Sequence, residues 1–323
     1  MSAVREPAAD AGQQVPQNGA QADAGQQVPE NGAEAEAAAG RGYVSPVGGR
    51  VRFRDLLRAE WVKYWSLRST YAVLGAGAAV AVGINANSAR SNEELLSRPN
   101  TPAPGMPERP VDRQFLFDPL GTAFTAPAWQ ILMVVAAGLG AMALTGEHGS
   151  GLIRTTFAAV PARRAVAAAK GVVVVAVTAV LGTVVAGVSF GVTQAVLREH
   201  GGLSIADPGA FRAVAASALL IPVCALIGLA TGALVRHSAG SVGAVVGLLV
   251  LAPGLFNGET YRWVKEIGNV LPVNAWQKLV QNPERHYGTP KYPVTETEAW
   301  VALGAWALVA AVLVLWVVER RDV

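Results

Sequence analysis

Six long apolar windows limit what this chain can fold into more than any other feature of its sequence. A helix needs about 20 predominantly apolar residues to cross the ~30 Å hydrocarbon core of a bilayer. The chain offers six such windows, centred on Ser69–Ala86, Pro127–Leu144, Gly171–Val192, Ala213–Val235, Ala239–Phe256 and Ala299–Val318. With 52% hydrophobic and 15% charged residues, it is too apolar for an ordinary soluble domain. We therefore expect an all-α, polytopic membrane protein with six transmembrane helices.

The charges between the windows predict how the helices are oriented. Connections rich in Lys and Arg stay in the cytoplasm, and alternate connections of this chain are basic, whereas those between them, such as 87–126, are balanced. We therefore predict that both termini are cytoplasmic (N-in/C-in). The basic connections carry Arg50, Arg52, Arg54, Arg58, Lys63 and Arg68, then Arg154, Arg163, Arg164 and Lys170, then Arg236, then Arg320 and Arg321.

The first 42 residues differ from the rest of the chain. They contain no aromatic residue, and AGQQVPQNGA at 11–20 returns as AGQQVPENGA at 24–33. Such a segment cannot bury enough apolar surface to offset the entropy lost on ordering. We predict a disordered low-complexity tail over 1–42, followed by a six-span domain over 43–323.

An amphipathic helix is predicted just before the first span, in VRFRDLLRAEWVKYW. Its apolar face carries Phe53, Leu57, Trp61, Tyr64 and Trp65, with Arg54, Arg58 and Glu60 largely elsewhere. Two tryptophans beside basic residues suit a helix that lies in the cytoplasmic headgroup layer. The alternative is a cytoplasmic extension of the first span.

Small residues predict where the helices pack. The pairs Gly187/Gly191, Gly228/Gly232 and Gly243/Gly247 have the four-residue spacing that lets helix backbones approach closely in lipid. The single cysteine, Cys224, stands in an apolar run, where we expect a small buried hydrophobe rather than a reactive thiol.

Three common motifs of nucleotide binding, metalloproteases and redox or metal sites are missing from the sequence. It has no G-x-x-x-x-G-K-[ST] phosphate loop, no H-E-x-x-H and no C-x-x-C. We therefore predict no catalytic, cofactor-binding or metal-binding residues and no nucleic-acid partner. The spans also lack the interior Asp, Glu, Lys or Arg that ion-coupled carriers use. Either a partner supplies energy, or none is used.

The segment Thr145–Lys170, TGEHGSGLIRTTFAAVPARRAVAAAK, resembles the cytoplasmic loop of ABC-2-type transporter permeases. The resemblance rests on an acid, a Gly turn, a Pro and a basic exit into the third span. R-A-E-W-x-K at Arg58–Lys63 and LPVNAW at 271–276 also fit, whereas Leu152 stands where that family often has Thr. The residues concerned in the loop are Glu147, Gly151, Arg154, Pro161, Arg163, Arg164 and Lys170.

The resemblance implies a multi-pass subunit of an exporter in the bacterial cytoplasmic membrane. It would pair with a second permease copy or paralogue, and each would dock on a separate ATP-binding subunit that binds ATP and Mg²⁺ and hydrolyses the ATP. Glu147 and Arg154 would be the candidates for contact with the ATPase. Arg163, Arg164 and Lys170 would mainly anchor the chain to anionic lipid headgroups. Residues 257–298 would form short helices that re-enter the outer leaflet.

Two other functions compete with this one. A non-transporting membrane scaffold or sensor could recruit a cytoplasmic partner through the 145–170 loop. An intramembrane enzyme acting on lipids is less consistent with the sequence, because it shows no nucleophile–base or metal constellation. The sequence does not specify a substrate.

Overall fold

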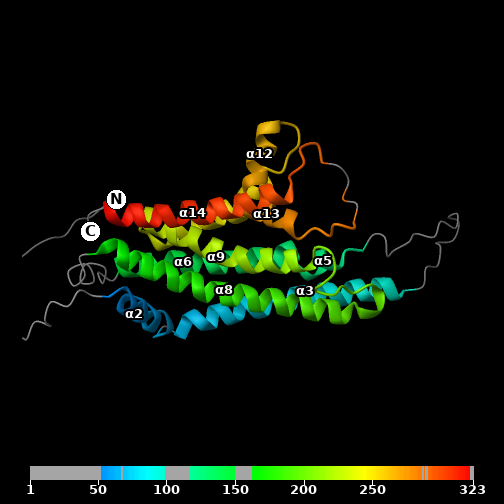
Figure 1. The fold of residues 1–323 in the computed structure, drawn as a ribbon, viewed down its shortest axis with the longest axis horizontal. Helices are drawn as coiled ribbons and strands as arrows, with labels where there is room; N and C mark the ends of the chain where they lie inside the picture. Colours follow the sequence, from blue (N-terminus) through cyan, green and yellow to red (C-terminus); the bar gives the residue numbers. More distant parts are fainter. Residues whose placement is uncertain are drawn as a thin grey trace, which may run out of the picture. The chain divides into compact units, whose positions relative to one another are not determined.

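A computed structural model describes residues 52–66, 68–98, 117–149, 162–285, 287 and 290–320. The predicted tail over 1–42 lies outside the described residues, as do Gly151, Arg154 and Pro161 of the predicted coupling loop. All regular structure within the described ranges is helical (Figure 1). The predicted all-α fold is therefore confirmed for the described residues.

Six helices are long and apolar enough to cross a membrane, which supports the predicted multi-pass membrane protein. The fifth consists of three consecutive segments, α10 (Ser238–Val246), the π-helical η2 (Gly247–Leu251) and α11 (Ala252–Leu255). The other five are α3 (Arg68–Ser97), α6 (Ala126–Gly149), α8 (Arg163–Val196), α9 (Ala210–Val235) and α14 (Glu296–Arg320). Helices α3 and α8 extend well beyond the windows predicted for them.

Large apolar side chains on the outside of these helices agree with a lipid environment. Val180 and Val184 of α8 are 65% and 56% exposed, and Leu308 and Val312 of α14 are 66% and 54% exposed. A soluble protein rarely leaves so much apolar surface uncovered, whereas lipid tails cover it without cost.

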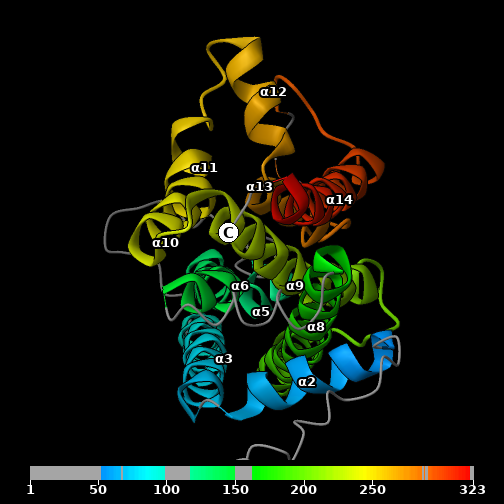
Figure 2. The same cartoon turned by 90° about the vertical axis from the view of Figure 1, so that its left-hand side faces the viewer.

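Helix α9 is the centre of the bundle, where it packs against α6, α8, α10, α13 and α14 (Figure 2). Its contact with α6 is close because a Cβ atom on Gly228 would lie 1.8 Å from the carbonyl oxygen of Ala137. A Cβ atom on Gly232 would likewise lie 2.6 Å from the carbonyl oxygen of Ala141. This glycine pair therefore packs two helices together as predicted. A Cβ atom added at Gly187, Gly191, Gly243 or Gly247 would meet nothing within 4 Å.

Aromatic rings fill the core beside α9. The rings of Trp129 and Trp276 lie 5.7 Å apart, and both side chains are fully buried. The indole N–H of Trp276 donates to Ser217 Oγ on α9 at 2.9 Å. Cys224 is fully buried among the same helices, which confirms its predicted role as a small core residue.

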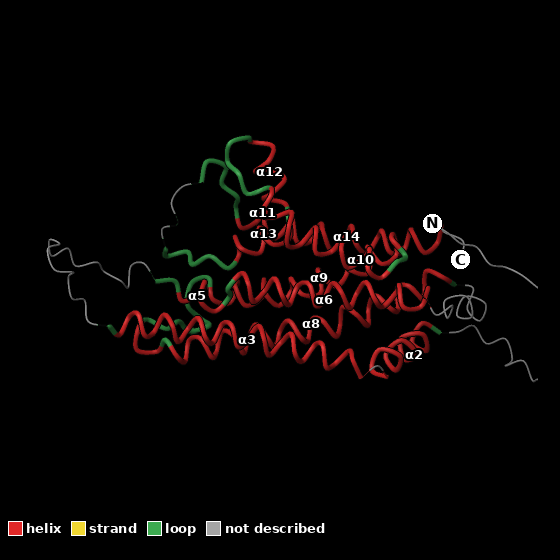
Figure 3. The backbone as a smooth tube through the Cα atoms, turned by 180° about the vertical axis from the view of Figure 1, so that it is seen from behind, coloured by secondary structure: helices red, strands yellow, loops and turns green. Residues whose placement is uncertain are grey.

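Shorter helices mark the two ends of the bundle. Helix α2 (Phe53–Ser66) crosses one end against α8 and α3, and the end of α14 lies at that same end (Figures 2 and 3). We call it the α2 end. The opposite α5 end carries α5 (Pro119–Ala123) and η1 (Arg198–His200). Two further short helices, α12 (Arg262–Val270) and α13 (Pro272–Leu279), precede α14, and their re-entry into the outer leaflet stays a prediction.

Candidate functional site

Four charged side chains meet at the α2 end and form a closed ring of alternating charge. Glu60 and Lys63 come from α2, Glu147 from the last turns of α6, and Lys170 from α8, about two turns after its start at Arg163. Glu147 and Lys170 therefore stand on either side of the connection between α6 and α8. We call these four residues the charged ring.

Each member of the ring contacts two members of opposite charge. Lys170 Nζ lies 2.7 Å from Glu60 Oε2 and 2.8 Å from Glu147 Oε1. Lys63 Nζ closes the ring, 2.5 Å from Glu147 Oε1 and 3.1 Å from Glu60 Oε1. The ring thus joins three helices through ion pairs, and its four charges sum to zero.

The ring is mostly withdrawn from water. The side chains of Lys170, Glu60 and Glu147 are 5%, 8% and 9% exposed, whereas that of Lys63 is 39% exposed. Buried charges are tolerated when they are paired and hydrogen-bonded, which the alternation provides. Burial of the Lys63 ammonium lowers its pKa, but the hydrogen bonds and charges of Glu147 and Glu60 outweigh it, so its pKa lies above the ordinary value of 10.5.

Two expectations for the loop residues change as a result. Lys170 was expected to reach anionic headgroups, but its ammonium is enclosed between two carboxylates of this chain. Glu147 was expected to meet a cation on a partner protein, whereas its carboxylate contacts Lys63 and Lys170. Both differ from the expectation because α2 folds over the end of the bundle and covers them.

The face of α2 that packs on the bundle carries an acid. Glu60, which lies largely off the predicted apolar face, is the one buried residue among those of α2 that the structure describes. Phe53, Trp61 and Trp65 are 45%, 47% and 39% exposed, and Leu57 is half-buried. A buried acid needs cations, and these come from Lys63 of its own helix and from Lys170.

Arg163 and Arg164 are the other predicted loop residues that the structure describes. Arg164 is exposed and forms an ion pair with Glu319 near the end of α14. Arg163, at the start of α8, is half-buried. The structure therefore brings together Glu147 and Lys170 of the predicted set, and adds Glu60 and Lys63. The sequence signal for these two was the E-x-x-K spacing in Arg58–Lys63, which was noted only as part of a resemblance.

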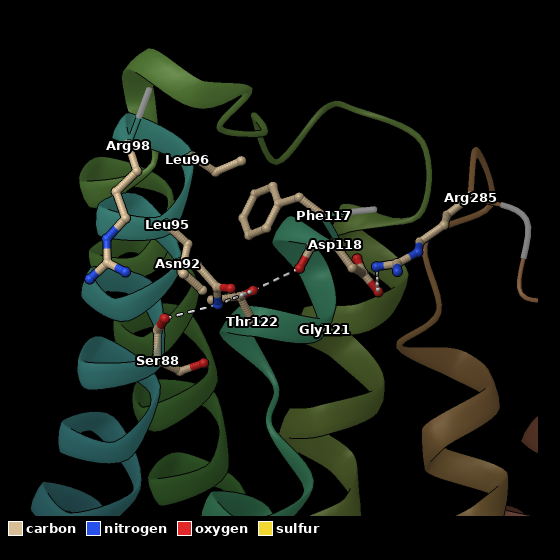
Figure 4. Close-up of a pocket in the computed structure, with 10 residues that line it drawn as sticks. All are labelled: Ser88, Asn92, Leu95, Leu96, Arg98, Phe117, Asp118, Gly121, Thr122 and Arg285. Carbon is tan, nitrogen blue, oxygen red and sulfur yellow. Dashed lines mark hydrogen bonds and ion pairs between the residues drawn. The ribbon is translucent and has the colours of Figure 1, made fainter. Parts of the chain in front are cut away.

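A polar pocket of about 560 Å³ opens at the α5 end (Figure 4). Asn92 of α3 donates to Thr122 Oγ1 at 3.3 Å, and Thr122 Oγ1 in turn donates to the carbonyl oxygen of Asp118 at 2.8 Å. The Asp118 carboxylate caps α5 at Leu120 N and lies 3.9 Å from Arg285 Nη1. Leu95, Leu96 and Phe117 supply apolar wall. The polar groups that line the pocket are largely hydrogen-bonded or ion-paired to one another.

Ion pairs and hydrogen bonds hold both regions together. Among the described residues, no group of three or more His, Cys, Asp or Glu side chains could hold a metal ion. The ion pairs of the charged ring tie α2 to the two helices that flank the 150–161 segment. No protein-family model matches this chain, and the search of curated proteins finds no match.

Proposed function

We propose that this chain is the membrane-spanning subunit of an ATP-driven exporter of the ABC-2 type, working with a separately encoded ATPase subunit in a bacterial cytoplasmic membrane. The proposal combines the resemblance of the 145–170 loop with the six apolar helices. The exporter would contain two such membrane subunits, identical or paralogous, and two ATPase subunits.

The charged ring is the observation that best supports this function. A membrane subunit driven by a soluble ATPase must transmit movement from a cytoplasmic loop to its helices. Glu147 and Lys170 stand at the two roots of that loop, and both are held to α2 by ion pairs. A displacement of the loop would therefore move α6, α8 and α2 together, which is what coupling to an ATPase requires.

The proposed orientation has both termini and the α2 end in the cytoplasm, with α2 in the cytoplasmic headgroup layer. Basic connections alternate with balanced ones in support of it. Cysteine labelling tests it well, because the single native cysteine, Cys224, is fully buried. Gly105→Cys should react with an impermeant thiol reagent added outside intact cells, and Ala158→Cys only after the cells are opened. The reverse pattern would overturn the orientation.

Co-purification with the ATPase encoded by the neighbouring reading frame tests the function. Arg154→Glu reverses a loop charge outside the ring and should weaken recovery of the ATPase. Arg262→Glu makes the same reversal on α12, outside this loop, and should leave recovery unchanged. The exporter assignment is wrong if two results are found together. The unmodified chain recovers no ATPase, and in cells that express it ATP depletion leaves the export of every probe unaffected. The scaffold hypothesis would then replace the exporter assignment.

Coupling can be separated from docking with Glu147→Gln. This change keeps the size of the side chain and removes one ring charge, while the loop surface beyond it is unaltered. We expect the ATPase still to co-purify, but its hydrolysis to lose the stimulation that the assembled membrane subunit gives. Unchanged stimulation with normal binding would mean that force does not pass through the ring.

A further inference from the structure

One flank of α2 carries a regular stripe of arginine and tryptophan. Arg54, Arg58, Trp61 and Trp65 are spaced at i, i+4, i+7 and i+11, the spacing that aligns side chains along one side of a helix. All four are exposed, with Trp61 and Trp65 at 47% and 39%. The stripe therefore lies beside the face that holds Glu60 against the bundle, and not on it.

The stripe continues onto the outer surface of the first span. The ring of Trp65 stacks on that of Tyr71 in the first turn of α3, with centroids 6.1 Å apart, and Trp65 also contacts Trp61 at 5.8 Å. Tyr71 is 44% exposed, and Val73 and Val80 further along α3 are 43% and 46% exposed. These residues belong to the apolar exterior of a membrane-spanning helix, so the tryptophan end of the stripe borders the lipid-facing surface.

The arginines of the stripe keep their positive charge available. Arg54 has Asp55 at 3.8 Å, but both side chains are at least half exposed, so water screens this pair. Arg58 has no ion pair among the described residues. Lys63 and Glu60 of the same helix are used within the charged ring. The surface that α2 presents is therefore cationic beside aromatic rings.

We infer that this stripe is a recognition surface for anionic phospholipids, with the arginines on the phosphates and the tryptophans at the headgroup boundary. Arginine binds phosphate oxygens through paired N–H donors, and tryptophan favours the interface between headgroups and acyl chains. The ring fixes how α2 is rotated, so the stripe is held in one direction. Bound anionic lipid would in turn steady α2 and the ring behind it.

The inference rests on the proposed place of α2 in the headgroup layer and goes beyond it by naming the lipid class. Tryptophan quenching by dibrominated lipids tests both. The full chain is reconstituted in vesicles of phosphatidylcholine with phosphatidylglycerol, with either lipid brominated in turn. The signal from α2 is the difference between the chain and its Trp61→Phe/Trp65→Phe variant.

We expect brominated phosphatidylglycerol to quench these two tryptophans at lower mole fraction than brominated phosphatidylcholine. An arginine near a charged bilayer surface contributes about a fivefold preference, so Arg58→Gln should lower the relative affinity about fivefold and Arg54→Gln/Arg58→Gln further. Raised salt should weaken the preference as well, because exposed charges are screened.

The matched control removes a cation from the same end of the bundle but from another element. Arg236 is exposed in the turn after α9 in a left-handed conformation (φ 57°), which asparagine tolerates, so Arg236→Asn is the substitution to use. The Arg236→Asn chain should keep the full preference for phosphatidylglycerol over phosphatidylcholine. An equal loss of this preference in Arg236→Asn and Arg58→Gln would overturn the inference. The attraction to anionic lipid would then come from the summed positive charge of the whole α2 end and not from the stripe.

Two further results would also overturn it, and they differ in meaning. Equal quenching by both brominated lipids would leave α2 in the headgroup layer but without anionic recognition. Quenching of these tryptophans by neither lipid would remove α2 from the headgroup layer altogether. Neither result bears on the ATPase partner, which the co-purification tests separately.

Discussion

The two ends of the bundle are fastened in different ways. At the α2 end, four charges close on one another and three of their side chains are under 10% exposed. At the α5 end, Arg212 donates to two backbone carbonyl groups, and the Asp118 carboxylate accepts from one backbone N–H and from the Tyr287 hydroxyl. Their charged partners Glu296 and Arg285 are 49% and 28% exposed. The first end depends on charge pairing, and the second on hydrogen bonds that water can partly replace.

This difference indicates where the chain has to be rigid. A closed neutral ring holds three helices in one arrangement, because moving any of them leaves a buried charge unpaired. The α5 end has longer connections and an open pocket of about 560 Å³, so its elements can shift at lower cost. The rigid end is also the one that carries the loop proposed to meet the ATPase.

The largest effect is expected from Lys170→Met. It leaves Glu60 and Glu147 buried with Lys63 as the one remaining cation of the ring, and breaking a buried pair costs about 3–5 kcal/mol of unfolding free energy. Thermal unfolding in detergent measures it. The comparable change at a more exposed pair, Lys265→Met beside Glu259, should cost under about 1 kcal/mol.

A second substitution shows whether charge or shape is responsible. Adding Glu60→Gln to Lys170→Met leaves one Lys and one Glu, so part of the lost stability should return. If the double variant is the sum of the two single losses, the four residues do not act as a ring.

Arg212→Met should have the largest effect at the α5 end, but a smaller one than Lys170→Met. The Arg212 guanidinium donates to Leu279 O at 2.9 Å and to Gln281 O at 2.6 Å, and it pairs with Glu296. Losing hydrogen bonds from a charged donor costs about 1.5–3 kcal/mol. A loss greater than that of Lys170→Met would contradict the contrast between the two ends.

Asp118→Ala should cost less again, about 1 kcal/mol, the usual value of a lost helix cap. Its carboxylate accepts from Leu120 N at 3.1 Å and from the Tyr287 hydroxyl. Burial and this hydrogen bond raise the pKa of Tyr287, so the variant should also let Tyr287 ionise at lower pH. Ultraviolet titration of tyrosine, compared with a Tyr287→Phe chain, measures that change.

The smallest effect concerns alkaline pH. The pKa of Lys63 is raised in the folded chain, so its contribution to stability is full below 10.5 and is lost as pH rises through the higher folded value. Because its side chain is 39% exposed, we expect under about 1 kcal/mol. Between neutral and strongly alkaline pH, the unfolding free energy of the Lys63→Gln chain should fall less than that of the unmodified chain. An equal fall in both chains would show that Lys63 does not titrate with folding.

The spans could be predicted from the sequence because their signal is local. Each is a long run of apolar residues, and the connections differ in charge. The packing of Gly228 on Ala137 was foreseeable only as a spacing, and two other pairs with the same spacing make no such contact. Which glycine pair packs depends on how neighbouring helices are arranged, and local patterns do not contain that information.

The candidate site was only half predictable for the same reason. Glu147 and Lys170 stood out because they flank one loop. Glu60 and Lys63 are more than 80 residues away in sequence from Glu147, and their hydrogen bonds with it and with Lys170 span separations of 84 and 110 residues. The helical spacing of α2 placed Glu60 largely off the apolar face, and such spacing does not show which distant helix will cover a residue.

The alternation in the charged ring also sets how this protein can change over evolutionary time. Replacing one of Glu60, Lys63, Glu147 or Lys170 alone leaves an odd charge in a buried place, so single changes should be selected against. Exchanges that swap an acid and a base together, or neutralise one of each, remain open. Across homologous sequences these four positions should therefore co-vary, with α2 substitutions matched by substitutions at the two roots of the loop.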